Sequence, residues 1–119
     1  MSEENKAKTC FVIMPISDQP KYPTGHFDKI YEQIIVPAVQ KAGFEPIRAD
    51  NDQICDSIMQ KILKNLAECD MAICDLSSRN PNVMYELGIR QAYGKKVVLI
   101  QDDVTDKIFD VAGINTVFY

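Results

Sequence analysis

The sequence predicts an α/β fold, a doubly wound parallel sheet of about five strands with helices on both faces. Short apolar runs of strand length alternate along the chain with longer stretches whose apolar residues recur every three or four positions. Such alternation gives parallel strands joined by right-handed helical crossovers. The chain has 119 residues and a hydrophobic content of 46%, which is enough for one domain with a real core.

Five apolar runs are predicted to be strands. The first, residues 9–16, is almost continuously apolar, which is typical of a strand buried on both faces of a parallel sheet. Pro15 should end it, because a central strand needs every N–H. Pro46 places the second strand at an edge for the same reason. The predicted strands are residues 9–16, 44–49, 71–76, 97–100 and 114–119.

Helical periodicity links these strands. Pro37 should kink the first helix, and Gly43 and Gly94 are expected helix ends. Asn51 or Asp52 can cap the second helix. A long polar loop, residues 17–26, precedes the first helix, and loops of that length at strand ends often bind ligands. The predicted helices are residues 27–42, 52–69, 81–93 and a short one at 107–112.

Charge and cysteine usage exclude several classes. The net charge is −4 and the basic residues are spread along the chain, so no nucleic-acid surface is expected. No membrane-spanning segment or signal peptide is apparent, which predicts a cytoplasmic protein. The four cysteines form no C-x-x-C pair and are read as structural. Residues 1–8 should be a disordered lead-in and 9–119 one domain. Because the chain stops on its last predicted strand, we expect it to be excised from a longer protein.

The absence of several common motifs limits the reactions that the chain could catalyse. The chain has no phosphate-binding loop of the G-x-x-x-x-G-K-[ST] kind and no G-x-G-x-x-G. Its one histidine, His26, is expected to be a surface residue at a helix start more often than a ligand contact. No His/Cys cluster has the spacing of a metal site, so neither a metal nor a cofactor is predicted. Carboxylate chemistry remains.

The run from Asp75 to Gly88 carries that chemistry. It reads as a buried strand ending in a carboxylate, a polar loop, and a helix that begins near Pro81 and carries Glu86. Open α/β sheets bind ligands beyond the carboxyl ends of their strands, so both carboxylates could face one pocket. Glu86 is expected to point with Asn82 and Arg90. Two plainer interpretations stay open: Glu86 and Arg90 form only an exposed i,i+4 pair, and Asp75 merely caps its loop.

Three segments resemble the nucleoside 2-deoxyribosyltransferase-like and TIR-like superfamily. They are Phe11-Val-Ile-Met-Pro-Ile16, Cys69-Asp-Met-Ala-Ile-Cys-Asp-Leu76 and Asn80-Pro-Asn-Val-Met-Tyr-Glu-Leu-Gly88, followed by Gly94-Lys-Lys-Val-Val-Leu-Ile100. The resemblance implies a flavodoxin-like sheet. It implies that Glu86 attacks or stabilises the anomeric carbon of an N-glycoside and that Asp75 orders the sugar or the glutamate. Substrate-binding residues implied by the resemblance and the loop are Met14, Pro15, Ile16, Ser17, His26, Ser77, Asn80 and Asn82.

The resemblance favours an NAD hydrolase, a bacterial defence effector that releases nicotinamide and ADP-ribose or a cyclic product. Two alternatives stay open: nucleoside or nucleotide 2-deoxyribosyl transfer or hydrolysis, and a non-catalytic nucleotide-binding or scaffold domain. In the first case NAD is a substrate, with Ser17 and the N-terminus of helix 27–42 holding its phosphates. A homo-oligomer and a fused sensor domain are also expected, with no nucleic-acid or membrane partner.

Overall fold

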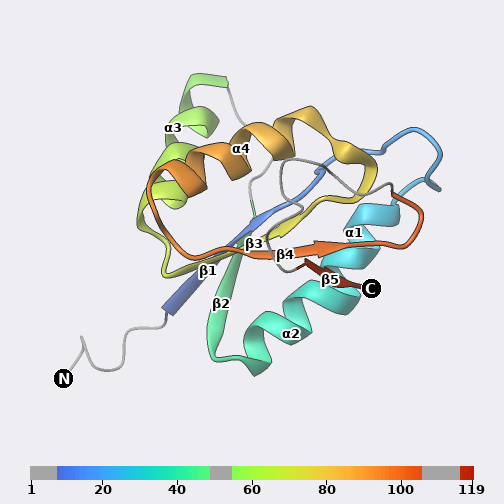
Figure 1. The fold of residues 1–119 in the computed structure, drawn as a ribbon, viewed down its shortest axis with the longest axis horizontal. Helices are drawn as coiled ribbons and strands as arrows, with labels where there is room; N and C mark the ends of the chain where they lie inside the picture. The colour runs from blue at the N-terminus through green and yellow to red at the C-terminus, as the bar shows by residue number, and fades with distance from the viewer. Residues whose placement is uncertain (1–7, 49–54, 106–115) are drawn as a thin grey trace.

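The computed structural model describes residues 8–48, 55–105 and 116–119, with only the backbone described at 55–59. It contains a five-stranded parallel sheet in the order β2-β1-β3-β4-β5 (Figure 1). This is the flavodoxin-like order, so the predicted fold class is confirmed. The strands are β1 Lys8–Ile13, β2 Phe44–Arg48, β3 Met71–Asp75, β4 Val98–Gln101 and β5 Thr116–Phe118.

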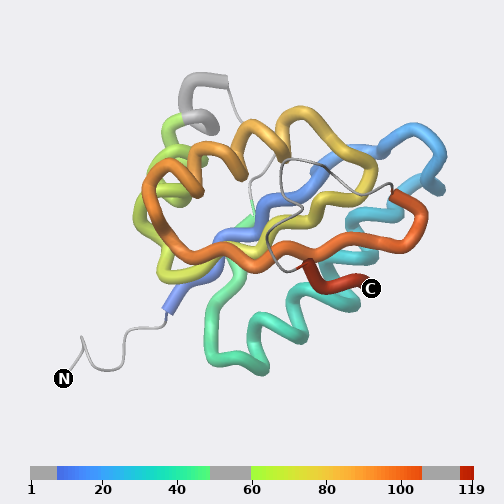
Figure 2. The backbone as a smooth tube through the Cα atoms, in the orientation of Figure 1, coloured from blue at the N-terminus to red at the C-terminus, as the bar shows by residue number. Residues whose placement is uncertain are grey.

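Helices cover both faces of the sheet. The pair α3 (Cys55–Glu68) and α4 (Pro81–Ala92) lies on one face, and α1 (His26–Ile30) and α2 (Val36–Lys41) lie on the other (Figure 2). Alternation along β1 divides the core, because Phe11 and Ile13 pack under α3 and α4 while Cys10 and Val12 pack under α1 and α2. The sheet is therefore buried on both sides, as its continuous apolar strands predict.

Of the three proline predictions for the first half of the chain, the edge position of Pro46 is confirmed, Pro15 lies just beyond the end of β1, and the helix around Pro37 is irregular. Pro46 lies in β2, which is an edge strand that pairs only with β1. The predicted helix 27–42 is interrupted by a π-helical segment, Tyr31–Ile35, which ends two residues before Pro37. Proline removes a helical N–H and its ring clashes with the preceding turn, and the wider π turn accommodates that loss.

The remaining elements agree with the prediction to within a few residues. Gly43 and Gly94 follow α2 and α4 with φ of 91° and 68°, the left-handed conformation of a helix end. The three cysteines with described side chains are buried and free. No helix in the described part of the chain is long and apolar enough to cross a membrane. The lead-in 1–7, the caps Asn51 and Asp52, and the helix at 107–112 lie outside the described residues.

A buried arginine holds α4 against the end of α3. The Arg90 side chain has no exposed surface; its Nη1 donates to the carbonyls of Leu66 and Cys69 at 3.0 Å each, and its Nε donates to Lys96 O at 3.0 Å. The last carbonyls of a helix have no partner within the helix, and the negative end of the helix dipole favours a cation there. Arg90 thus fixes α3, α4 and the approach to β4 in one arrangement.

Replacing Arg90 by methionine should destabilise the fold strongly. Methionine keeps much of the volume but leaves the three carbonyls without their donor, so we expect a loss of about 3 kcal/mol or more in the free energy of unfolding. Urea unfolding of Arg90→Met against wild type measures it. Lys95→Met, at an exposed neighbouring position, is the control and should change stability by less than about 0.5 kcal/mol. Equal effects of the two substitutions would contradict the role given to Arg90.

Candidate functional site

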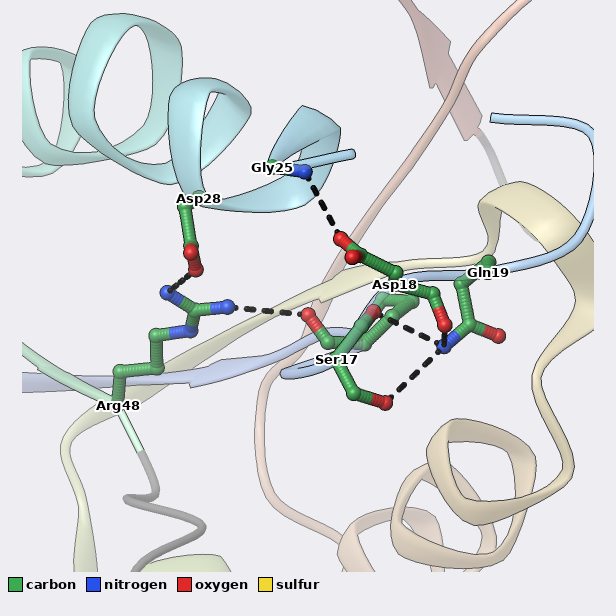
Figure 3. Close-up of polar contacts among 7 residues, drawn as sticks. Ser17, Asp18, Gln19, Gly25, Asp28 and Arg48 are labelled. Carbon is green, nitrogen blue, oxygen red and sulfur yellow. Dashed lines mark hydrogen bonds and ion pairs between the residues drawn. The ribbon is translucent and has the colours of Figure 1, made fainter. Parts of the chain in front are cut away.

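The topology brings two loops together at one end of the sheet. The chain leaves β1 towards β2 on one side and later returns through β3 on the other, so the carboxyl ends of β1 and β3 form the topological switch point where such sheets bind ligands. A hydrogen bond joins the loops that follow these strands: Asn80 Nδ2 donates to Gln19 Oε1 at 2.9 Å. Gln19 in turn donates to the Ser17 carbonyl at 3.0 Å (Figure 3).

The loop after β3 leads into α4 through a tight turn. Ser77–Arg79 forms a 3-10 turn in which Ser78 and Arg79 adopt positive φ, 66° and 54°. Asn80 is the N-cap of α4, and its Oδ1 accepts from the N–H groups of Asn82 (2.9 Å) and Val83 (3.1 Å). Asn80 therefore starts the helix and ties it to the β1 loop, while the Asn82 side chain is exposed.

Asp75 is the most deeply buried carboxylate of this end of the sheet. It is 1% exposed, its Oδ1 accepts from Ser77 N–H at 2.9 Å, and its Oδ2 accepts from the Tyr119 hydroxyl at 2.6 Å. Burial raises the pKa of Asp75, while the hydrogen bonds from Tyr119 and Ser77 favour the ionised form and oppose that rise. The Ser77 contact agrees with the interpretation that Asp75 caps its loop. That interpretation did not include the hydrogen bond from Tyr119, the last residue of the sequence.

A second polar cluster continues this network to the loop after β4. Asp102 N–H donates to Ser77 Oγ at 2.9 Å. The Asp102 carboxylate accepts from the Tyr22 hydroxyl at 2.6 Å and from Thr105 N–H at 3.0 Å. Burial raises the pKa of Asp102, but these hydrogen bonds outweigh it and lower the pKa. Asp102 therefore stays ionised and holds the β1 and β4 loops together.

Glu86 lies on α4, more than one turn past the helix start, and is half-buried. Burial raises its pKa to about 7, well above that of an ordinary glutamate. Its charge, together with that of Asp75, also raises the pKa of the buried Cys74 thiol, which places both carboxylates near Cys74. No described residue donates a hydrogen bond to the Glu86 carboxylate or forms an ion pair with it.

The expected grouping of Glu86 with Arg90 is wrong, whereas Asn82 and Glu86 lie four residues apart on α4, the spacing of one helix face. Arg90 is fully buried and donates to backbone carbonyls, whereas Asn82 is exposed at the helix start. The exposed Glu86–Arg90 ion pair is excluded for the same reason. The helical period explains the error: position 90 shares the buried stripe of Val83 and Leu87, and that stripe outweighs the preference of a charged side chain for water.

The loop after β1 places the other predicted binding residues at different depths. Met14 and Pro15 are buried, Ile16 is half-buried and Ser17 is exposed. Arg48 Nη2 donates to the Pro15 carbonyl at 3.1 Å, which anchors the start of the loop to β2 (Figure 3).

His26 is half-buried rather than a surface histidine as predicted. Its ring lies 4.9 Å from Tyr22 and 4.8 Å from Phe27, centroid to centroid, and its Nε2 is buried without a hydrogen-bond partner among the described residues.

The N-terminus of the first helix is already occupied by a carboxylate. Asp18 Oδ1 accepts from Gly25 N–H at 2.8 Å, and Gly25 is the N-cap of α1 (Figure 3). An anion placed there would meet the charge of Asp18. The expectation that Ser17 and this helix end hold phosphates is therefore not supported by the geometry.

A cleft of about 460 Å³ opens at the same end of the sheet. Three loops line it, those that follow β1, β3 and β4. No group of three or more His, Cys, Asp or Glu side chains within the described ranges is placed to hold a metal ion. The lining residues are Pro20, Lys21, Tyr22, Ser78, Arg79, Val104 and Thr105.

Sequence reasoning missed several residues of the cleft and of the polar network beside it. Asp102 and Thr105 directly follow a predicted strand, and that position at the carboxyl end of a parallel sheet was the available signal. Tyr22 and Tyr119 gave none, because their hydroxyls meet partners more than 40 residues away.

Comparison with known proteins supports the fold. No protein-family model and no curated protein sequence matches the chain. A CMP N-glycosidase from Clostridium botulinum matches over 94% of this chain and 89% of its own, with a TM-score of 0.67 and 17% identity. A 2-deoxyribosyltransferase from Leishmania mexicana matches over 89% of this chain and 71% of its own, with a TM-score of 0.64 and 22% identity. The deoxyribosyltransferase-like half of the expected resemblance is thus supported at the level of fold; neither structure is described as TIR-like.

Removing the Tyr119 hydroxyl should loosen the Asp75 network. Tyr119→Phe deletes the donor to Asp75, so we expect a loss of about 1–2 kcal/mol in the free energy of unfolding. The loss should be larger at pH 8 than at pH 5, because the hydroxyl stabilises the ionised form of Asp75. Thermal unfolding at both pH values checks this. Tyr85→Phe removes a hydroxyl from a residue 63% exposed on α4 and should have no comparable effect; a pH-independent loss at Tyr119 would contradict the Asp75 contact.

Proposed function

We propose that the protein cleaves the N-glycosidic bond of a nucleoside or nucleotide, by hydrolysis or by transfer of the sugar to another base. The observation that carries the proposal is Glu86, a half-buried carboxylate with no described partner and a pKa raised to about 7. It projects from the helix that begins at the topological switch point of the sheet. The fold shared with an N-glycosidase and a deoxyribosyltransferase supports the same reaction class.

A carboxylate of this kind can stabilise the positive charge that the reaction develops on the sugar. As the bond from C1′ to the base breaks, its electron pair leaves with the base nitrogen and positive charge develops on C1′ and the ring oxygen. Ionised Glu86 stabilises that charge or adds to C1′ to form an ester. Water, or a ring N–H of an acceptor base, then attacks C1′. Any ester bond to Glu86 breaks, and the proton lost by the nucleophile ends on the nitrogen of the departed base. Burial strips water from the carboxylate, which makes it a more basic nucleophile than an exposed one.

The other predicted residues receive supporting roles under this proposal. Asp75 acts as a positioning residue, because both of its oxygens already hold Ser77 N–H and the Tyr119 hydroxyl. Asn80 sets the start of the helix that carries Glu86. The β1 loop, from Met14 to Ser17 with His26 at its end, faces the sugar or the base. Asn82 is exposed beside it.

NAD is kept as a substrate to test, but its hydrolysis is not the main proposal. The expectation of a defence effector rested on the TIR-like half of the resemblance, for which the reported structures give no support. The bond in NAD is also an N-glycoside, so the same glutamate would serve it. A panel of nucleosides, nucleoside 5′-monophosphates and NAD, with chromatographic detection of released base or nicotinamide, separates these substrates.

Glu86→Gln should abolish turnover while stabilising the fold. We expect activity to fall by a factor on the order of a thousand or more. Between pH 4.5 and 7 the folded state keeps a proton on Glu86 that the unfolded state has released, so this residue lowers stability as pH rises through that window. At pH 8 the glutamine variant should be about 1–3 kcal/mol more stable than wild type, and near pH 4 the two should agree.

Activity assays and thermal unfolding check both expectations. Glu45→Gln, at an exposed position on β2, is the control and should change neither. A fully active Glu86→Gln protein would refute the proposal, whatever its stability.

The pH dependence of activity provides a separate test. The reaction needs ionised Glu86, so kcat/KM should rise with pH and reach a plateau above about 7. Initial rates between pH 5 and 9, on a substrate that does not itself titrate there, give the profile. A plateau already reached at pH 5 would mean that Glu86 has an ordinary pKa or is not the group required.

A further inference from the structure

We propose that the cleft at the switch point binds the phosphate of a nucleoside 5′-monophosphate through Lys21 and Arg79. The inference rests on the proposed function and narrows its substrate from nucleosides in general to mononucleotides. Lys21 comes from the β1 loop and Arg79 from the turn before α4, and both line the cleft of about 460 Å³. The two residues thus contribute to one hollow from two different loops.

These two cations are available to a ligand. Both side chains are exposed, and neither has a hydrogen bond or an ion pair with any residue in the described ranges. The chain as a whole carries a net charge of −4, so a pair of unneutralised cations in one cleft is not a consequence of a basic surface. Arginine and lysine are the usual phosphate ligands of proteins, arginine by paired hydrogen bonds and lysine as a point charge.

The backbone of the cleft is held in uncommon conformations. Lys21, Ser78 and Arg79 have φ of 72°, 66° and 54°, and they are the three non-glycine residues with positive φ in the described part of the chain. All three line the cleft. Such conformations cost energy for residues with a Cβ and concentrate at functional sites. The Ser78 Oγ is buried and without a partner among the described residues, so it offers the ligand an additional hydroxyl.

The acidic residues nearby do not close the cleft to an anion. Asp102 is 8% exposed, does not line the cleft, and directs its carboxylate to Tyr22 and Thr105. Asp75 is directed to Ser77 and Tyr119. By contrast, Asp18 occupies the N-terminus of α1, which leaves the Lys21–Arg79 cleft as the better place for a phosphate at this end of the sheet.

The cleft and Glu86 belong to one structural unit. Arg79 immediately precedes the N-cap of α4, and Glu86 is the sixth residue of that helix, a rise of about 9 Å along the axis from the cap. A mononucleotide has its phosphate and its anomeric carbon at opposite sides of one ribose. Glu86 does not itself line the cleft, so a phosphate held between Lys21 and Arg79 requires the ribose to extend from the cleft along α4 towards the carboxylate.

The test compares Lys21→Gln/Arg79→Gln with a control of equal charge change, Lys41→Gln/Lys95→Gln, whose residues are exposed and lie outside the cleft. For the cleft variant we expect the ratio of kcat/KM on a nucleoside 5′-monophosphate to that on the matching nucleoside to fall at least about tenfold, the effect of losing a charge-assisted contact. The control should keep the wild-type ratio. An unchanged ratio in the cleft variant would overturn the inference.

Calorimetric binding separates this inference from the proposed function. In the Glu86→Gln background, a nucleoside 5′-monophosphate should bind, and adding Lys21→Gln/Arg79→Gln should weaken it at least about tenfold. NAD, the free nucleoside and inorganic phosphate complete the ligand set. Cation-dependent binding without cleavage of any substrate would refute the proposed function and keep the phosphate site. Cleavage with cation-independent binding, tighter binding of NAD than of the monophosphate, or no binding of the monophosphate at all would refute the site.

Discussion

The burial of the Asp75 carboxylate at the end of the central strand β3 is the constraint on which this end of the molecule depends. A carboxylate that is 1% exposed is costly unless hydrogen bonds replace its water. One replacement is local, from Ser77 N–H, and the other comes from Tyr119, 44 positions along the chain. Because Ser77 Oγ also accepts from Asp102 N–H, the ends of β3, β4 and β5 are joined by polar contacts. The loops that form the candidate site are thus held in place by a network that a purely apolar core would not supply.

Helix α4 carries two buried charges that are treated in opposite ways. Arg90 is fully buried, and its Nη1 and Nε donate to three backbone carbonyls, so its burial stabilises the packing of α3 against α4. Glu86, one turn earlier, is half-buried, and this burial raises its pKa to about 7 with no described hydrogen bond to oppose the rise. A helix selected for stability alone would pair or expose that carboxylate. A half-buried carboxylate with a raised pKa and no described partner is typical of functional groups.

Sequence patterns predicted what is local and missed what is long-range. Periodicity predicts the strands and the fold class, and the missing N–H of proline predicts the edge position of β2. Both signals depend only on residues that are close together in the sequence, as do the glycines that end the helices. Asp75 and Glu86 were proposed as site residues because Asp75 ends a predicted strand and Glu86 lies on the helix that follows it. Tyr119 and Tyr22 were missed because their partners lie more than 40 residues away, and Arg90 was misplaced because two of its three partner carbonyls lie 24 and 21 residues away. Arg90 was nevertheless readable, since it continues the buried stripe of Val83 and Leu87, and only its charge argued for exposure.

The distribution of charge gives the two proposals a common physical basis. Lys21 and Arg79, cations without a partner in the described part of the chain, line the cleft, whereas the carboxylates Asp75 and Glu86 lie outside its lining and raise the pKa of the buried Cys74 thiol. The transition state of nucleotide cleavage has the same polarity, with a phosphate anion on one side of the ribose and a developing cation at C1′ on the other. A site with carboxylates at the phosphate and cations at C1′ would repel both the phosphate and the developing positive charge. Binding the phosphate at the cations would therefore also orient C1′ towards Glu86, so that affinity for the unreactive end of the substrate contributes to the reaction at the other end.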